Sequence, residues 1–372
     1  MLRVMMLTTD LQRGGLPLRL VRLACRLRDV DVEPIVGCLA PPGPLSAVLE
    51  SAGIETFSCD AHGSFDATCL TRLAGHVRRI RPNLIHSSLF HANLAARLVG
   101  RFDAPRPIIT STVTIEIERT WHRWMESLTC GWSDLHVANS AAVAAHVCTD
   151  LGFSPSRVVV IPNGVDIERI DQAPMIERQA FGIEPDVPLV VWAGRMDPVK
   201  DLATFVEVIA LLRKRGKITA VLLGDGPERP HIQAFIHHCG LESVIRMALW
   251  SDNVAGWLKA ADVLLFPSLT EGSPNVVIEA MLCRCPVVAS DLPATRELIE
   301  PGTRGFLCYA GDIGHFTASI AELSTNDALR RDLVDAARQR AVQRHNIQHV
   351  VRQWRSIYDR MVAALSKTSG LL

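Results

Sequence analysis

Short apolar segments alternate with amphipathic segments along nearly the whole chain. In the first half, apolar runs at residues 2–9, 32–39 and 108–113 are separated by segments with helical spacing, such as 16–28 and 66–80. The apolar runs are nearly continuous, which is typical of strands buried on both faces of a parallel sheet that helices cover. The same alternation returns in the second half, so the pattern predicts an α/β protein throughout.

The length of the chain predicts more than one core. With 372 residues the chain is too long for one ordinary core, and we expect two domains of roughly 150 to 200 residues each. A turn cluster at residues 162–166 marks the crossing between them. The predicted domains are therefore 1–165 and 166–347, and the last helical segment, 348–372, has an apolar stripe that could cover either one.

One segment of the second half combines two glutamates with the start of a predicted helix. The apolar run 261–267 opens into a loop that carries Glu271, and Pro274 fits the first turn of the following helix. The free amides of such a turn attract anions, whereas a carboxylate repels phosphate and is better suited to hydroxyls. Glu279 lies roughly 9 Å beyond Ser273 at about 1.5 Å per residue. We therefore expect an elongated ligand, with a sugar at one end, a diphosphate in the middle and a ribose at the other end.

Two cations follow another predicted strand. Arg195 and Lys200 lie on the loop after the apolar run 189–193. Two positive charges beside a helix N-terminus can neutralise a diphosphate without a metal ion. Asp29-Val-Asp31 has the DxD form of some metal-binding transferases, but it lies far from any glycine-rich loop, and we do not expect a metal site there.

Two glycine turns stand at predicted strand-to-helix connections. Gly14 and Gly15 allow a ligand to approach the backbone closely, or alternatively form a tight turn without a ligand. Gly224 and Gly226 have the form of a phosphate turn. Arg229 occupies the place of the third glycine of a GxGxxG motif, which argues against a nicotinamide site.

Two groups of side chains in the first half allow more than one interpretation. His91 lies at the carboxyl end of a predicted strand and either contacts a sugar hydroxyl or caps a helix. Trp121 and Trp124 are three residues apart, which favours core packing over stacking on a sugar.

Three arginines on the first predicted helix share one face. Arg19, Arg22 and Arg26 recur at helical spacing, and we expect a solvated face, with contact to anionic lipid or a phosphorylated acceptor as the alternative.

The composition excludes several classes of protein. Lys and Arg total 39 and so do Asp and Glu, so the chain lacks the net positive charge typical of a nucleic-acid binder. Its ten cysteines include no CxxC spacing, which argues against a zinc site or a disulfide framework. No apolar run is long enough for a signal peptide or a membrane span. We therefore expect a cytoplasmic protein, at most peripheral on the inner face of the membrane.

Six motifs in register resemble those of the retaining, nucleotide-sugar-dependent glycosyltransferases of family 4, also called group 1. They are Gly194-Arg195 with Lys200-Asp201, Gly224-Asp-Gly-Pro227, Phe266-Pro-Ser268, Glu271-Gly-Ser-Pro-Asn275, Glu279-Ala-Met281, and Pro301-Gly302 with Gly305-Phe-Leu307. The resemblance implies the glycosyltransferase-B (GT-B) fold, with two Rossmann-like domains facing across a cleft. It places the acceptor on the first domain and the donor on the second, and returns the helix 348–372 to the first.

The resemblance also implies roles for individual residues. Arg195 and Lys200 would bind the donor diphosphate and stabilise the leaving group, Glu271 would hold the transferred sugar, and Glu279 would hold the ribose. The implied donor-binding set is Gly194, Gly224, Gly226, Gly272, Ser273, Pro274, Asn275, Val276 and Glu279. Members of the family need no metal ion or cofactor and retain the anomeric configuration by front-face attack.

The chain departs from the family pattern at Thr114, at Ser88, where many relatives have a histidine, and at Leu249, where many have a glycine near the base. Thr114 stands where many relatives have a histidine, and His91 is a candidate to replace it; Gly14 and Gly15 complete the predicted acceptor side. The sequence thus predicts transfer from a UDP- or GDP-sugar to a hydroxyl of a glycan or lipid-linked acceptor, as in polysaccharide or lipopolysaccharide synthesis. Two alternatives stay open, namely a sugar-nucleotide epimerase of the same fold and a nucleotide-sugar-binding protein that has lost transfer.

Overall fold

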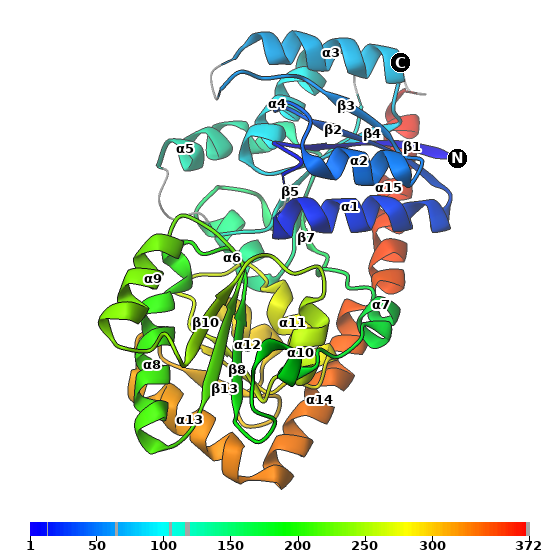
Figure 1. Ribbon diagram of the computed structural model, residues 1–372. Helices are drawn as coiled ribbons and strands as arrows, with labels where there is room; N and C mark the ends of the chain where they lie inside the picture. The colour runs from blue at the N-terminus through cyan, green and yellow to red at the C-terminus, as the bar shows by residue number, and fades with distance from the viewer. Residues whose placement is uncertain (13, 64–65, 104–105, 116–119, 370–372) are drawn as a thin grey trace. The chain divides into compact units, whose positions relative to one another are not determined.

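The computed structural model describes residues 1–12, 14–63, 66–103, 106–115 and 120–369 (Figure 1). The chain divides into two compact units. Unit 1 contains residues 1–164 together with 347–372, and unit 2 contains residues 165–346. The chain passes between the units at Gly164 and Val165, inside the predicted turn cluster, and again at Asn346 and Ile347.

Unit 1 is built on a parallel sheet, whose strands in the described residues run in the order β3-β2-β1-β4-β5-β6-β7. The strands are β1 (Leu2–Thr8), β2 (Val32–Cys38), β3 (Glu55–Ser58), β4 (Leu84–Ser88), β5 (Ile108–Thr112), β6 (Leu135–Ala138) and β7 (Val158–Val160). The helices are α1 (Gly15–Leu27), α2 (Pro44–Ser51), α3 (Thr68–Ile80), α4 (Phe90–Asp103), α5 (Thr120–Thr129), α6 (Ala141–Thr149) and α15 (Ile347–Ser369), with a 3₁₀ turn η2 (Cys130–Trp132) after α5.

Helices cover both faces of this sheet (Figure 1). One apolar cluster joins β1 and β2 to α1, α2 and α15, and includes Trp354 and Tyr358 of α15. A second cluster on the other face joins the sheet to α3 and α4. The last helix therefore belongs to the core of unit 1, because its apolar stripe lies among the residues of that core.

Unit 2 is built on a second parallel sheet, with the order β10-β9-β8-β11-β12-β13 in the described residues. The strands are β8 (Leu189–Ala193), β9 (Thr219–Leu223), β10 (Ile245–Ala248), β11 (Val263–Phe266), β12 (Val287–Ser290) and β13 (Phe306–Cys308). The helices are α7 (Ile167–Gln172), α8 (Leu202–Arg215), α9 (Arg229–His238), α10 (Val254–Ala260), α11 (Asn275–Leu282), α12 (Pro293–Leu298), α13 (Ile313–Thr325) and α14 (Asp327–His345). None of the helices in the described part of the chain has the length and apolar character needed to cross a membrane.

The strands explain why the sequence shows continuous apolar runs. In β8, Val190 and Trp192 enter one core cluster, whereas Leu189, Val191 and Ala193 enter a second cluster with Trp257. Successive side chains of a strand point to opposite faces, and here both faces are covered. The α/β prediction is therefore confirmed for both units.

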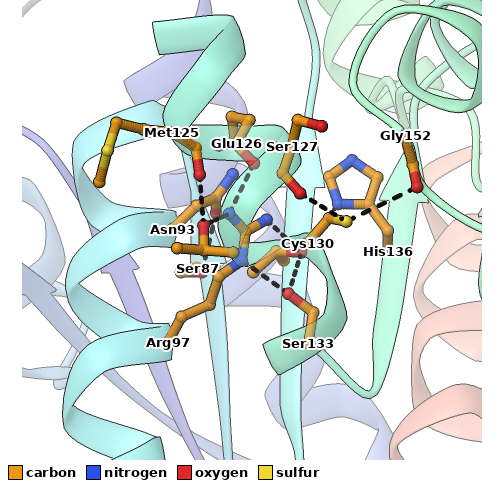
Figure 2. A network of polar contacts seen from close by, with 12 residues as sticks. Ser87, Asn93, Arg97, Met125, Glu126, Ser127, Cys130, Ser133, His136 and Gly152 are labelled. Carbon is orange, nitrogen blue, oxygen red and sulfur yellow. Dashed lines mark hydrogen bonds and ion pairs between the residues drawn. The ribbon is translucent and has the colours of Figure 1, made fainter. Parts of the chain in front are cut away.

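A buried charge network holds the middle of unit 1 together (Figure 2). Arg97 of α4 is fully buried, and its Nη1 lies 2.6 Å from Oε2 of Glu126 on α5. The same guanidinium donates to the hydroxyls of Ser133 at 2.8 Å, Thr129 at 3.1 Å and Thr110 at 3.4 Å. Burying a charge is costly unless it is paired and hydrogen-bonded, and Arg97 meets both conditions. One side chain thus fixes α4, β5 and α5 relative to one another.

This network gives a first prediction. Glu126→Ala leaves the Arg97 charge buried without its counter-ion and should lower the free energy of unfolding of unit 1 by roughly 3–5 kcal/mol. Removing both charges in Arg97→Met with Glu126→Leu should restore much of this loss, because no uncompensated charge remains. Urea unfolding of the full chain, followed by circular dichroism, measures both. A loss below about 1 kcal/mol in Glu126→Ala would contradict the role assigned to the pair.

Candidate active site

The strand order of unit 2 selects one position on the edge of its sheet. Both β9 and β11 lie beside β8, so the connections from β8 and from β11 leave the sheet in opposite directions. In open parallel sheets, ligands bind outside the carboxyl ends of the strands at such a reversal, because the two loops separate there. The loops after β8 and β11 are the ones that carry Lys200 and Glu271.

The structure brings these two side chains into direct contact. Lys200 Nζ donates to Glu271 Oε1 at 2.6 Å, and both side chains are largely buried. The Lys200 ammonium also lies 5.9 Å from the centre of the Phe266 ring, at the end of β11. A backbone hydrogen bond of 2.8 Å from Leu269 N to Val199 O joins the two loops. The sequence predicted both residues in one site but not their ion pair.

Asp201 fixes the loop that carries Lys200. Its backbone has a φ of +47°, a conformation that non-glycine residues rarely adopt. The Asp201 carboxylate accepts from Thr204 N at 3.4 Å and from Thr204 Oγ1 at 2.6 Å, which caps the N-terminus of α8. The cap holds the preceding turn in place, so Asp201 positions Lys200 without reaching the site itself.

Arg195 lies on the same loop with its side chain 63% exposed. Its Nε is 3.3 Å from Oδ1 of Asp197, which is a weak interaction at this exposure. The guanidinium is therefore accessible to a ligand, in contrast to the largely buried ammonium of Lys200.

The glycines of this edge are explained by backbone packing. Gly224 has a φ of +137°, and a Cβ there would lie 1.9 Å from the carbonyl oxygen of Gly194. Gly226 has a φ of +158°, and its Cβ would lie 2.5 Å from the carbonyl oxygen of Met196. Both positions exclude any side chain, since the loop after β9 packs directly on the loop after β8.

The start of α11 differs slightly from the prediction. Pro274 is the N-cap residue and Asn275 the first helical residue, so the proline lies just outside the first turn. Glu279 is half-buried on α11, whereas Gly272 is buried in the loop before it. Ser268 of the Phe266-Pro-Ser268 motif is fully buried, and its Oγ has no hydrogen-bond partner among the described residues.

In unit 1 three of the four predicted acceptor-side residues lie on two loops at the carboxyl edge of the sheet. Gly14 and Gly15 start α1 after β1, and His91 lies in the first turn of α4 after β4. The order reverses between β1 and β4, so these are the two loops of the unit 1 switch point. A cavity of about 350 Å³ at this edge is lined by His91, Thr9 and Asp66 among mostly apolar residues. Thr114 is exposed after β5, and it does not line this cavity.

An aromatic cluster surrounds His91. The ring centres of Phe90, Trp121 and His122 lie 5.0 to 6.1 Å from the ring centre of His91. The rings of Phe90 and Trp121 also lie close together, with their centres 5.1 Å apart. The prediction that Trp121 and Trp124 pack in the core is wrong, because they remain 43% and 65% exposed. Trp121 packs edge-on against Phe90 without being buried by it.

The arginine face of α1 is only partly solvated, in contrast to the solvated face that we expected. Arg19, Arg22 and Arg26 are all half-buried; Arg19 donates to Asn163 Oδ1 at 2.8 Å, and Arg26 pairs with Asp29 at 3.6 Å. Burial lowers the pKa of Arg19 to about 10, so it stays charged at neutral pH.

The buried histidine of β4 is neutral. Its Nδ1 is hydrogen-bonded to the Tyr358 hydroxyl at 2.8 Å and its Nε2 to Ser111 Oγ at 2.9 Å. Burial, together with the nearby charge of Arg19, lowers the pKa of His86 to about 3. His86 therefore joins the sheet to α15 and does not exchange protons near neutral pH.

Metal-ligand geometry is missing from the described residues, where no group of three or more His, Cys, Asp or Glu side chains is placed to hold an ion. The charged groups on the loops and helix at the unit 2 edge are two cations, Arg195 and Lys200, and two carboxylates, Glu271 and Glu279. The N-terminus of α11 lies on the same segment as the carboxylates.

Family models match both units. The Glycosyltransferase Family 4 model matches residues 13–169, and the Glycosyl transferases group 1 model matches residues 187–326. Among solved structures, HepE of Anabaena in complex with UDP is similar with a TM-score of 0.85, at 21% identity over 96% of this chain and 100% of that one. Sucrose-phosphate synthase from Thermosynechococcus elongatus is similar with a TM-score of 0.84, at 17% identity over 98% of this chain and 100% of that one.

Curated relatives agree with the family models. The D-inositol 3-phosphate glycosyltransferase of Streptomyces bingchenggensis is 26% identical over 87% of this chain and 80% of that protein. The UDP-Gal:alpha-D-GlcNAc-diphosphoundecaprenol alpha-1,3-galactosyltransferase of Escherichia coli is 24% identical over 80% of each chain. With both domains matched and the GT-B fold shared, the chain belongs to the group 1 glycosyltransferases of family 4.

Proposed function

We propose that this glycosyltransferase moves a sugar from a nucleoside-diphosphate sugar to a hydroxyl of a glycan or lipid-linked acceptor, with retention of configuration and without a metal ion. The observation that carries the proposal is the Lys200–Glu271 pair, which puts a cation and a carboxylate 2.6 Å apart at the switch point of unit 2. A phosphate and a sugar hydroxyl are the groups that this pair can bind side by side.

The donor diphosphate would bind to Lys200 and Arg195. Lys200 is held by its loop and needs little reorganisation, whereas the exposed Arg195 can close over the phosphates. The first turn of α11, with Asn275 and Val276, would add the positive end of the helix dipole, which favours an anion. Two cations and a helix end can stabilise the charge that develops on the leaving diphosphate.

The carboxylates would bind the two sugars of the donor. Glu271 lies beside the cation that holds the diphosphate, so its hydroxyl partners belong to the transferred sugar. Glu279 lies about one turn into α11 and would bind the ribose at the other end of the ligand. Gly194, Gly224 and Gly226 keep this edge free of side chains, which leaves the nucleotide room to lie against the backbone.

In the proposed reaction the bond between the anomeric carbon and the phosphate oxygen breaks first. The leaving phosphate oxygen takes the proton of the acceptor hydroxyl, and the acceptor oxygen attacks the same face of the sugar. The glycosidic bond therefore forms with the configuration of the donor. The residues of this chain act by electrostatic stabilisation, and none of them forms a covalent intermediate.

The relatives support the choice of donor and acceptor. The Escherichia coli relative is named for transfer from UDP-galactose to a sugar on diphosphoundecaprenol, and HepE was solved with UDP. We propose a UDP-sugar as donor. On the acceptor side we propose His91 as the residue that contacts the attacking hydroxyl in place of the exposed Thr114, because His91 lines the cavity at the unit 1 switch point.

Removing either member of the ion pair should abolish most of the turnover. Lys200→Ala and Glu271→Ala are each expected to lower kcat by at least about 10²-fold, the size of losing one stabilising group in the transition state. The Lys217–Glu184 pair, an exposed ion pair of 3.1 Å in the same unit, provides the matched control. Lys217→Ala should leave kcat unchanged, and near-normal turnover in both site variants would reject the site.

The stereochemical course separates the proposal from its rivals. An NMR time course with a UDP-sugar and an acceptor, run in the presence of a chelator, should give a product with the anomeric configuration of the donor. An inverted product would contradict the proposed mechanism. Conversion of the donor to an epimer without an acceptor would favour the epimerase. Binding without transfer or hydrolysis would favour a protein that has lost activity.

His91→Ala should act on the acceptor alone. Losing one hydrogen bond to the acceptor should raise the acceptor KM by roughly three- to tenfold. The donor KM and the slow hydrolysis of the donor should not change, because Lys200 and Glu271 are intact. His146→Ala on α6 is the control. This histidine does not line the cavity, and its Nδ1 lies 2.6 Å from Oδ2 of Asp150. Equal acceptor KM values in His91→Ala and the unaltered chain would show that His91 does not contact the acceptor.

A further inference from the structure

Helix α5 of unit 1 has its polar side turned inward and its apolar side turned outward. The residues that it buries are His122, Glu126 and Thr129, all of them polar. On the outer side, Trp124 is 65% exposed and Leu128 is 61% exposed. An ordinary surface helix shows the opposite arrangement.

The inward side is fixed by the buried charge network. Glu126 accepts from Arg97, and Thr129 Oγ1 accepts from the same guanidinium while donating to Met125 O (Figure 2). Rotating α5 to bury its tryptophans would expose Arg97 or leave it without a counter-ion, at a cost of several kcal/mol. The outward apolar face is therefore a fixed feature of the fold.

The apolar face extends over the whole helix and past its end. Trp121 at the start of α5 is 43% exposed, and Trp132 on η2, after the helix, is 37% exposed. All seven tryptophans of the chain lie in the described ranges; Trp192, Trp257 and Trp354 are buried, and Trp250 of unit 2 is the other exposed one. We call the surface formed by Trp121, Trp124, Leu128 and Trp132 the α5 face.

The charges around the α5 face favour an anionic surface. The exposed Arg157 lies next to η2, with its Nη1 3.4 Å from Gly131 O, and Arg123 is half-buried on α5. Among the residues that the structure describes, the acids nearest to this face have partners of their own. Glu126 binds Arg97, Asp134 Oδ2 accepts from Ile108 N at 2.7 Å, and Asp150 pairs with His146.

We infer that the α5 face docks on the surface of a lipid bilayer that contains anionic lipids. Tryptophan is the side chain best suited to the boundary between headgroups and acyl chains, because its ring is apolar and its N–H needs a polar partner. Helices that anchor proteins in the membrane interface present Trp and Leu on one face with basic residues beside them, and the α5 face has the same composition. This inference about bilayer binding does not depend on the proposed function. Only the further step, that the acceptor is linked to a lipid of that bilayer, rests on the proposed function.

Vesicle sedimentation with the full chain tests this inference. The unaltered protein should bind vesicles of phosphatidylcholine with phosphatidylglycerol more tightly than vesicles of phosphatidylcholine alone. Trp124→Ser with Leu128→Ser should weaken binding at least about tenfold, since both side chains contribute apolar area to the contact. The substituted side chains are exposed, so the thermal unfolding midpoint should not change.

A second pair of exposed side chains provides the control. Met175 and Tyr309 of unit 2 are 63% and 71% exposed, and Met175→Ser with Tyr309→Ser should bind vesicles like the unaltered chain. Failure of the unaltered chain to bind vesicles, or equal binding by the α5 variant, would overturn the inference. A dimer that forms without lipid and that the α5 variant abolishes would assign the face to a second copy instead. Donor hydrolysis, measured in the same samples, tests the proposed function separately.

Discussion

The reversal of strand order at the carboxyl edge of each sheet is the constraint from which the candidate site follows. Parallel strands all end at one edge of the sheet, where the chain leaves β8 and β11 in opposite directions, and a backbone hydrogen bond from Leu269 N to Val199 O joins the two loops. Lys200 and Glu271 come from those two loops and meet at 2.6 Å. The site thus needs no special element. It needs two loops of the right length, a cap at Asp201 that fixes one of them, and glycines at 224 and 226 that let the backbones pack.

Unit 1 depends in a similar way on one buried charge. Arg97 reaches from α4 to groups on β5 and α5 and to Ser133 just after η2, so α5 is fixed in rotation as well as in position relative to α4 and β5. The same contact has two results. It stabilises the region between His91 and β6, and it turns the apolar residues of α5 toward the outside. A purely apolar contact at this place would have allowed α5 to bury its tryptophans and would have left no exposed α5 face.

Sequence patterns predicted the α/β class, most element positions and the family, because continuous apolar runs and turn residues are local signals. They failed where the answer depended on long-range polar partners. Trp121 and Trp124 had the spacing of core residues, and nothing local indicated that Glu126 would take the inward side by pairing with Arg97, which lies 29 residues earlier in the chain. The half-burial of Arg19 depends likewise on Asn163, far along the chain. The Lys200–Glu271 contact could not be read from a separation of 71 residues, although each residue was identified from its own motif.

The pairing of Lys200 with Glu271 has a consequence for selectivity. A lysine that already has a carboxylate partner is a poor trap for a simple anion, because inorganic phosphate or a nucleoside diphosphate would bring negative charge close to Glu271 without offering it the hydroxyls of a transferred sugar. A ligand that offers phosphate oxygens to the lysine and hydroxyls to the glutamate in the proposed pose satisfies both groups at once. The internal ion pair would then act as a filter, which favours an intact sugar nucleotide over the spent nucleotide that remains after transfer.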